Sequence, residues 1–402
     1  MRVLTLNWGH GPYSISKIIR DIEAELNYED VSFFHLQESG EELGENYKSL
    51  SGWLEYRIYY VLAHITGRRY GTGYIPYLRV KKYIKSYTPD IVHIHCPNGF
   101  SINLYKVFNY LKKEHIPTVI TNHAEFFYTG NCAHSDECMQ FVSGCHGCVE
   151  YKERIQSWFF NRTEWAWRKM KMAFENFDTL YMIAVSNWMQ GRMKLSPISN
   201  KLTTAVIMNG IDTNIFKWVP CGESNDKIRR VVHVTSHFSD DISDMKGGYY
   251  VIELAKRCLM LPIEFIVIGD NYVKEENVPK NMKIVGIVKE QNELASYYRN
   301  ADLTLLTSKR ETFGMTCAES LACGTKVIGF YNGGTESIAI KQYTHLVEFG
   351  DIEKLKRVML ETLDEKIYEK SLISKEAEEK YSKKTMARNY LKIYQQAVKK
   401  GR

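Results

Sequence analysis

Two glutamates in the second half of the chain, Glu311 and Glu319, have the spacing that most clearly suggests chemistry. We expect a strand to end at Thr307, a loop to turn at Gly314 and a helix to follow. Glu311 then lies on the loop and Glu319 within the helix. The free backbone amides at the start of such a helix favour an anion such as a diphosphate. The pair predicts a site for an anionic ligand. The alternative is that Glu311 is a surface loop residue and that Glu319 is only favoured by the helix dipole.

Lys246 adds a positive charge that could act on the same ligand. It stands in Ser243-Asp-Met-Lys-Gly-Gly248, after a strand expected at Val231–Ser236. A lysine is a compact point charge that can neutralise a departing diphosphate. At a helix start this charge opposes the dipole, which favours a functional reason for its presence over a merely exposed side chain.

Two glycine turns complete the pattern in the second half. Gly333 and Gly334 follow a strand expected at Thr325–Phe330, and glycine lets a backbone approach a phosphate or a base closely. A turn-forming Asn209-Gly-Ile-Asp212 segment precedes the whole set.

Taken in this order, these motifs resemble the signature of glycosyltransferase family four, whose members are retaining enzymes with the GT-B fold. The resemblance rests on the Glu-(seven residues)-Glu pair with Phe-Gly after the first Glu, the Lys-Gly pair, the glycine turn and the Asn-Gly-Ile-Asp segment. It implies that Glu311 lies against the donor sugar, that Glu319 binds the ribose hydroxyls and that Lys246 acts on the diphosphate. The other residues that it places at the nucleotide are Phe313, Gly314, Met315, Gly333, Gly334 and, in the first half, Gly11.

The chain departs from the family pattern at one cation. Family members carry an Arg shortly after the strand that precedes the lysine, whereas this chain has Ser236-His-Phe238. His237, Lys309 or Arg310 could take its place, and the sequence leaves the three open.

Histidines mark the expected acceptor side. His123 follows the strand Thr118–Asn122 and resembles the family's Thr-x-His-Asp motif, which implies a place near the primary hydroxyl of the donor sugar. His10, in a glycine-containing loop after the first strand, either contacts substrate or is solvated. His93 and His95 share one face of a strand and are either buried structural residues or part of the site.

The resemblance implies front-face attack, in which the acceptor hydroxyl and the leaving phosphate lie on the same side of the sugar. Catalysis then comes from orienting the substrates and stabilising the leaving group, without a protein nucleophile, pyridoxal phosphate or a catalytic metal. We expect a nucleotide-sugar donor, most simply a UDP-sugar, and a glycan or lipid-linked saccharide acceptor. A nucleotide-sugar epimerase, a sugar phosphorylase and a non-catalytic zinc-containing interaction protein stay open as alternatives.

Four cysteines lie within a loop expected at residues 129–149. The sequence Cys145-His-Gly-Cys148 supplies two thiols at the spacing of a metal knuckle, and Cys132 and Cys138 stand just upstream. A structural zinc ion bound by all four would fix this loop. Two disulfides or four free thiols are the alternatives. The arrangement also resembles a subset of family-four enzymes of capsule and exopolysaccharide synthesis.

The alternation of short apolar runs with amphipathic stretches predicts an α/β protein of two Rossmann-like domains that face each other across a cleft. We expect an N-terminal acceptor domain over residues 1–210, a nucleotide-sugar domain over 211–385 and a C-terminal helix, 386–402, that packs back on the first domain. The segment Lys375–Lys399 is expected to be one long charged helix.

Composition narrows the class of protein further. The chain has 402 residues and a net charge of +6, which suits an anionic small ligand or membrane surface but not a nucleic acid. We expect a cytoplasmic protein, since the N-terminus resembles a first strand and no apolar run reaches the roughly 20 residues of a membrane span. Two aromatic and basic stretches, Trp53–Tyr70 and Trp158–Met172, either rest on the inner face of the membrane or pack in the core.

Overall fold

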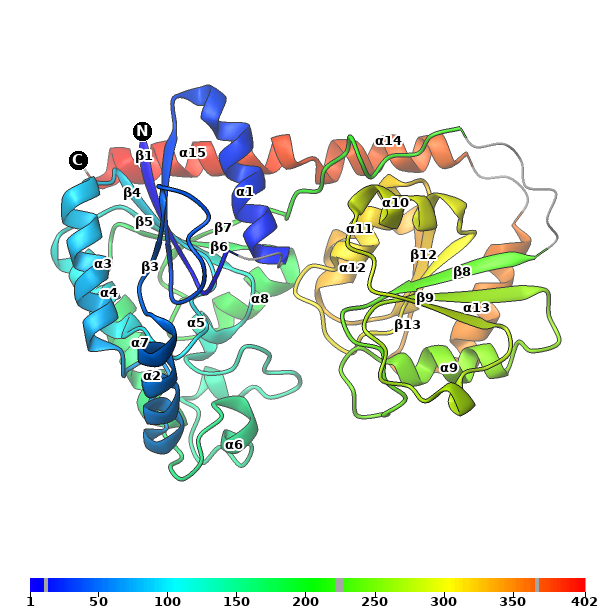
Figure 1. Ribbon diagram of the computed structural model, residues 1–402, viewed down its shortest axis with the longest axis horizontal. Helices are drawn as coiled ribbons and strands as arrows, with labels where there is room; N and C mark the ends of the chain where they lie inside the picture. Colours follow the sequence, from blue (N-terminus) through cyan, green and yellow to red (C-terminus); the bar gives the residue numbers. More distant parts are fainter. Residues whose placement is uncertain (11–13, 221–227, 366–368, 402) are drawn as a thin grey trace. The chain divides into compact units, whose positions relative to one another are not determined.

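The computed structural model describes residues 1–10, 14–220, 228–365 and 369–401, and the chain divides into two compact units (Figure 1). The N-terminal unit comprises Met1–Met208 and Met386–Arg402, and the C-terminal unit comprises Asn209–Thr385. Each unit contains one parallel sheet with helices packed against it. The predicted α/β class with two Rossmann-like sheets is therefore confirmed.

The N-terminal unit has a seven-stranded sheet in the order β3-β2-β1-β4-β5-β6-β7, and all its strand pairs are parallel. The strands β5 and β6 are buried at every position, as expected for the middle of a sheet covered on both faces. The strands are β1 (Arg2–Asn7), β2 (Ser32–Gln37), β3 (Tyr47–Ser49), β4 (Ile91–Ile94), β5 (Thr118–Asn122), β6 (Leu180–Ala184) and β7 (Thr203–Val206). The helices are α1 (Ser14–Leu26), α2 (Trp53–Thr66), α3 (Tyr74–Tyr87), α4 (Leu104–Lys113), α5 (Phe126–Thr129), α6 (Tyr151–Arg154), α7 (Thr163–Phe174) and α8 (Asn187–Leu195).

The C-terminal unit repeats this plan with a six-stranded parallel sheet in the order β10-β9-β8-β11-β12-β13. Its strands are β8 (Arg229–Val234), β9 (Ile263–Ile268), β10 (Met282–Gly286), β11 (Leu303–Leu306), β12 (Lys326–Phe330) and β13 (Thr344–Val347). Its helices are α9 (Gly248–Lys256), α10 (Gln291–Asn300), α11 (Met315–Ala322), α12 (Gly334–Ile338), α13 (Ile352–Asp364) and α14 (Lys370–Tyr381). None of the helices in the described part of the chain is both long and apolar enough to cross a membrane.

Strand order reverses once in each sheet, between β1 and β4 in the first and between β8 and β11 in the second. The loops that leave two such strands diverge to opposite faces, and the crevice between them is where open parallel sheets bind ligands. The fold therefore directs attention to the residues that follow these four strands.

The prediction of one helix over Lys375–Lys399 is wrong. The structure has two helices, α14 and α15 (Lys383–Gly401), because Ser382 adopts an extended conformation, with ψ 130°, and pairs with Ile211. Backbone hydrogen bonds on both sides of the break, from Ile211 N to Tyr381 O and from Lys383 N to Ile211 O, measure 2.8 and 3.0 Å. At the break, the backbone groups of Tyr381 and Lys383 form hydrogen bonds with Ile211, whereas in a continuous helix they would form them within the helix.

Helix α15 packs on the core of the N-terminal unit through Met386, Tyr390 and Tyr394, which are buried with β1, β4 and β5 side chains. Two buried hydrogen bonds fix it there. The Tyr394 hydroxyl lies 2.6 Å from His93 Nδ1, and the Tyr390 hydroxyl lies 2.9 Å from Thr121 Oγ1. Buried hydroxyls of this kind usually find such partners.

Candidate functional site

The loops that follow β8 and β11 bring Lys246 and Glu311 together at the reversal of strand order in the C-terminal unit. Lys246 Nζ lies 2.9 Å from Glu311 Oε1, and both side chains remain partly exposed. A hydrogen bond of 2.9 Å from Lys309 N to Met245 O ties the two loops to each other. Two residues that the sequence predicts to act on the same ligand are thus in direct contact.

Gly247 makes this approach of the two loops feasible. Its φ is +70°, and a Cβ at this position would lie 2.1 Å from Thr307 O at the end of β11. Any other residue would both strain the backbone and collide with the neighbouring strand end. The second residue of the Lys-Gly pair is therefore needed for a structural reason, because only glycine lets the lysine loop pack directly against the end of β11.

The glycine turn after β12 packs on the Glu311 loop. Glu311 N donates to Asn332 O at 3.0 Å, and Gly334 N donates to Glu311 O at 2.8 Å. A Cβ at Gly334 would lie 2.5 Å from Phe313 N, so only glycine permits this packing. The side chain of Glu336 closes the turn by accepting from Gly333 N at 2.7 Å. The predicted residues Gly333 and Gly334 are in this way backbone neighbours of Glu311.

Helix α11 begins directly behind this loop. Gly314 caps it with φ 94°, and Phe313 before it is buried, whereas Met315 and Glu319 are partly exposed. Glu319 Oε2 accepts a hydrogen bond of 3.2 Å from the hydroxyl of Tyr298 on α10. The N-terminal end of α11 thus lies beside the Glu311 loop, where the helix dipole favours an anion.

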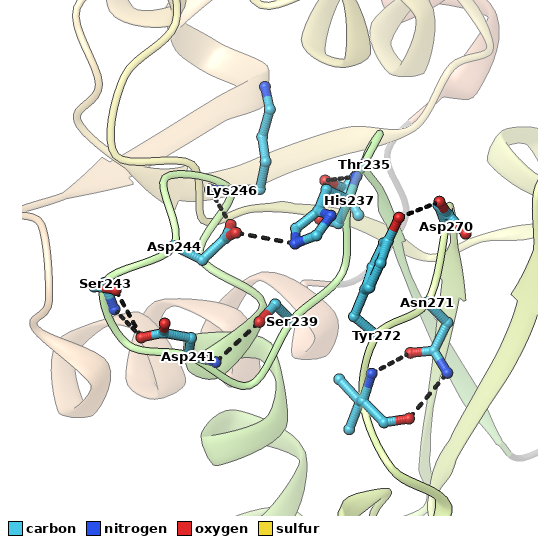
Figure 2. A network of polar contacts seen from close by, with 11 residues as sticks. Thr235, His237, Ser239, Asp241, Ser243, Asp244, Lys246, Asp270, Asn271 and Tyr272 are labelled. Atoms are coloured by element: carbon cyan, nitrogen blue, oxygen red, sulfur yellow. Dashed lines mark hydrogen bonds and ion pairs between the residues drawn. The ribbon is translucent and has the colours of Figure 1, made fainter. Parts of the chain in front are cut away.

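Asp244 and Tyr298 are site residues that sequence reasoning missed. Figure 2 shows Asp244 accepting from the backbone of Lys246 while the lysine side chain points away from that carboxylate. The same carboxylate contacts His237 Nε2 at 3.2 Å, and the His237 ring packs at a tilt against that of Tyr272, with centroids 4.2 Å apart. His237, one candidate for the missing cation, is therefore held within its own loop. Asp244 has a sequence signal, since it stands two residues before the lysine; Tyr298 has none.

His123 lies in the N-terminal unit, directly after β5. Its Nε2 is 3.2 Å from His95 Nδ1, and the two rings are stacked. Burial lowers the pKa of His123 to about 3, so the imidazole is neutral at physiological pH. His93 and His95 are both buried, and His93 is bound to Tyr394 and Thr121. The structural interpretation of His93 is correct, and His95 orients the ring of His123.

The prediction that His10 is solvated is wrong. Its ring is 2 % exposed and packs edge-on against His35 and Tyr47, each with centroids 5.2 Å away. Among the described residues, which omit 11–13, neither ring nitrogen has a hydrogen-bond partner, and burial together with His35 lowers the pKa of His10 to about 3. Gly11, the next predicted residue, lies outside the described residues.

The cysteine-rich loop contains free thiols. Cys132, Cys138, Cys145 and Cys148 form no disulfide, which excludes the two-disulfide alternative for them. Within the described part of the chain, no three His, Cys, Asp or Glu side chains are grouped to hold a metal ion, so the structure gives the zinc prediction no support. Hydrogen bonds hold this loop, such as that from Thr163 Oγ1 to Cys145 O at 3.1 Å.

The site in the C-terminal unit thus combines a cation, two carboxylates, a helix N-terminus and two glycine turns. Such a set can hold a diphosphate by charge and by backbone amides, and a sugar or ribose by carboxylate hydrogen bonds. It can stabilise a phosphate leaving group without any protein nucleophile.

Two protein families match the chain, one in each half. Residues 29–215 match the family described as Glycosyltransferase Family 4, and residues 235–380 match the family described as Glycosyl transferases group 1. The second match contains Lys246, Glu311, Glu319 and the glycine turn.

Individual relatives agree with these families. A probable sucrose-phosphate synthase from Thermosipho melanesiensis is 30 % identical over 204 residues, which are 47 % of this chain and 46 % of that protein. The alignment thus spans less than half of the relative's length. The solved sucrose-phosphate synthase from Thermosynechococcus elongatus has a TM-score of 0.68 at 15 % identity, with 98 % of this chain and 99 % of that chain covered. The Anabaena protein HepE, solved in complex with UDP and glucose, has a TM-score of 0.61 at 17 % identity, with 98 % of each chain covered.

Proposed function

We propose that the chain is a glycosyltransferase with the two domains of the GT-B fold, and that it transfers a sugar with retention of configuration from a UDP-sugar to a lipid-linked glycan. The acceptor suits the synthesis of a surface polysaccharide, in agreement with the resemblance of the cysteine-rich loop. The donor nucleotide is chosen because a neighbour of the same fold, HepE, was solved with UDP and glucose.

The observation that carries the proposal is the contact between Lys246 and Glu311. A donor diphosphate needs a cation at the oxygen that becomes negative as the glycosidic bond breaks, and Lys246 supplies it. A carboxylate 2.9 Å from that cation can accept hydrogen bonds from the hydroxyls of the transferred sugar. The two groups would therefore act on opposite sides of the bond that is cleaved.

The remaining residues of the site bind the nucleotide in this proposal. Glu319 accepts from the ribose hydroxyls, and the backbone amides at the start of α11 bind the diphosphate with those of Gly333 and Gly334. Phe313 and Met315 flank these amides and shape the pocket. His123 contributes a neutral imidazole as a hydrogen-bonding group near the donor sugar.

Retention follows from front-face attack. The acceptor hydroxyl approaches on the face from which the phosphate leaves, and the departing phosphate oxygen takes its proton. The protein then needs to orient both substrates and to stabilise the leaving diphosphate, but it forms no covalent intermediate.

Thermal melting against UDP-, GDP- and ADP-linked sugars tests the proposal, because a ligand that binds the folded state raises the melting temperature. We expect stabilisation by UDP-sugars alone and its loss in Glu319→Ala. The anomeric configuration of the transferred sugar, read by NMR, then tests retention. Stabilisation by no donor would reject the proposal, and inversion would reject its mechanism.

A further inference from the structure

Helix α2 turns its apolar side outward. Apolar residues recur at helical spacing along one stripe of the helix, and this stripe faces solvent. The buried residues of the helix are Ala63 and His64. The exposed apolar side chains are Trp53, Leu54, Ile58, Val61, Leu62 and Ile65. A surface helix of a globular domain normally buries such a stripe, and contiguous exposed apolar patches mark interaction sites.

A second exposed apolar segment, Trp158–Phe160, lies at the end of α2. Trp158 N donates to His64 O at 2.8 Å, and its ring packs on that of His64. Gly67, which ends the helix with φ +68°, has no Cβ to keep the segment away: a Cβ there would lie 2.6 Å from Phe160 O. Phe159 is 65 % exposed, so the segment extends the patch instead of covering it.

Three arginines border this patch, and each guanidinium lies over an aromatic ring. Arg57 lies 5.4 Å from the ring centroid of Trp53, Arg162 lies 5.5 Å from that of Phe160, and Arg68 covers Trp165. None of the three forms an ion pair within the described part of the chain.

The only acidic residue of α2, Glu55, is already paired with Arg79. The border of the patch is therefore cationic, with charge available for an anionic partner.

The patch is continuous with a cavity of about 390 Å³ at the carboxyl ends of β1 and β4. Trp8, Tyr56, Phe100 and Arg69 line it, and Tyr56 belongs to α2 itself. From Phe100 an unbroken set of ring contacts leads outward through Tyr60 and His64 to Trp158.

Arg69 supplies a cation inside this cavity. It lies 4.6 Å from the ring of Phe100, and its Nη2 donates to Asn98 O. Its Nε is buried and has no partner among the residues that the structure describes, which leaves a donor for an anionic group in the cavity.

We propose that the α2 stripe and Trp158–Phe160 insert into the surface of an anionic lipid bilayer, and that an amphiphilic acceptor enters the neighbouring cavity from that surface. The second clause rests on the proposed function, since it deepens the choice of a lipid-linked glycan. The hydrocarbon of the acceptor would then stay in the bilayer while its anionic linkage reaches Arg69.

Charge favours a bilayer over a second copy of this chain. In a two-fold symmetric dimer the same patch faces itself, so the bordering arginines Arg57, Arg68 and Arg162 of the two copies would come together in one interface. Like charges in a buried interface oppose association, whereas anionic headgroups attract each arginine while the apolar stripe enters the acyl boundary.

Co-sedimentation with vesicles tests the surface. The full chain is mixed with vesicles of equal parts phosphatidylcholine and phosphatidylglycerol, and with phosphatidylcholine alone. We expect binding to the anionic vesicles that weakens in high salt, and a fall of the partition coefficient by about tenfold or more in Ile58→Glu/Leu62→Glu.

A matched control replaces two exposed aliphatic residues of the C-terminal unit, in Leu259→Glu/Met260→Glu, and this variant should bind like the native chain. The proposal is overturned if the native chain stays in the supernatant, or if both double variants lose binding equally. It is also overturned if sedimentation velocity shows a dimer that only Ile58→Glu/Leu62→Glu dissociates, because the occupant is then a second copy.

Donor binding separates this inference from the proposed function. Both double variants should keep the thermal shift with UDP-sugars. Ile58 and Leu62 lie in the N-terminal unit, and Leu259 and Met260 are exposed residues outside the proposed donor set. Vesicle binding without any donor shift would reject the proposed function and leave the membrane surface standing. A donor shift without vesicle binding would reject the membrane surface and leave the proposed function standing.

Discussion

Lys246 and Glu311 are 65 residues apart in the sequence, and their side chains meet at 2.9 Å. The contact joins the loops after β8 and β11, the two strands at which the order of the second sheet reverses. In the proposed function, the carboxylate holds the ammonium group in place for a donor phosphate. Side chains held in this way lose little freedom when the transition state forms, which is the condition for electrostatic catalysis.

Lys246→Ala should lower kcat by roughly 10²–10³-fold, the effect typical of removing one group that stabilises developing negative charge. The thermal shift produced by UDP should remain, because the lysine acts more strongly on the transition state than on the bound nucleotide. Steady-state kinetics and melting curves measure both quantities. Lys280→Ala, which removes an exposed lysine of the same unit just before β10, is the control and should keep near-native kcat. Equal effects of the two variants would show that only general positive charge matters.

Glu319→Ala should weaken UDP binding by about 10–100-fold, because hydrogen bonds to a charged group contribute about 1.5–3 kcal/mol. Tyr298→Phe is the matched control, since it removes the hydroxyl that donates to Glu319 and leaves the carboxylate in place. Isothermal titration calorimetry with UDP compares the two. If Tyr298→Phe weakens binding as much as Glu319→Ala, the carboxylate acts through the structure of α10 and α11 and not on the ribose.

Gly247→Ala should destabilise the C-terminal unit by about 1–3 kcal/mol, since the new Cβ meets Thr307 O at 2.1 Å and the backbone stays at φ +70°. Urea unfolding measures the free energy. The control is Gly191→Ala in α8, where a Cβ meets nothing within 4 Å and helix propensity predicts a gain of about 0.5–1 kcal/mol. A neutral Gly247→Ala would mean that the loop can move off β11, and the pairing of Lys246 with Glu311 would then need another explanation.

The meeting of Lys246, Glu311 and Gly333 could be predicted from the sequence, because each stands in a loop that leaves the carboxyl end of a strand. In a parallel sheet these ends lie at one edge, so the three loops reach the same edge. Tyr298 could not be predicted in this way, because it reaches Glu319 from the end of another helix. Contacts between helices depend on packing that no local spacing encodes.

The failures have local physical causes. The charged sequence from Lys375 favours a helix throughout, but the bridge between Ser382 and Ile211 is a contact across 171 residues that overrides this propensity. His10 carries the polar character of a loop residue, yet the sheet edge folds His35 and Tyr47 over it.

His10→Phe should make the protein less sensitive to acid. The pKa of His10 is lowered from 6.5 to about 3 in the folded state, so between these values the unfolded chain binds more protons and stability falls as the pH falls. One such group lowers the free energy of unfolding by about 2 kcal/mol when the pH falls from about 7 to about 5. Urea unfolding at both pH values should show that the free energy of unfolding of His10→Phe falls by about 2 kcal/mol less than that of the native chain. His115→Asn, which replaces an exposed histidine, should keep the native loss. If His10→Phe keeps it too, His10 is protonated as readily in the folded protein as in the unfolded chain, and its ring nitrogens must reach water or another partner.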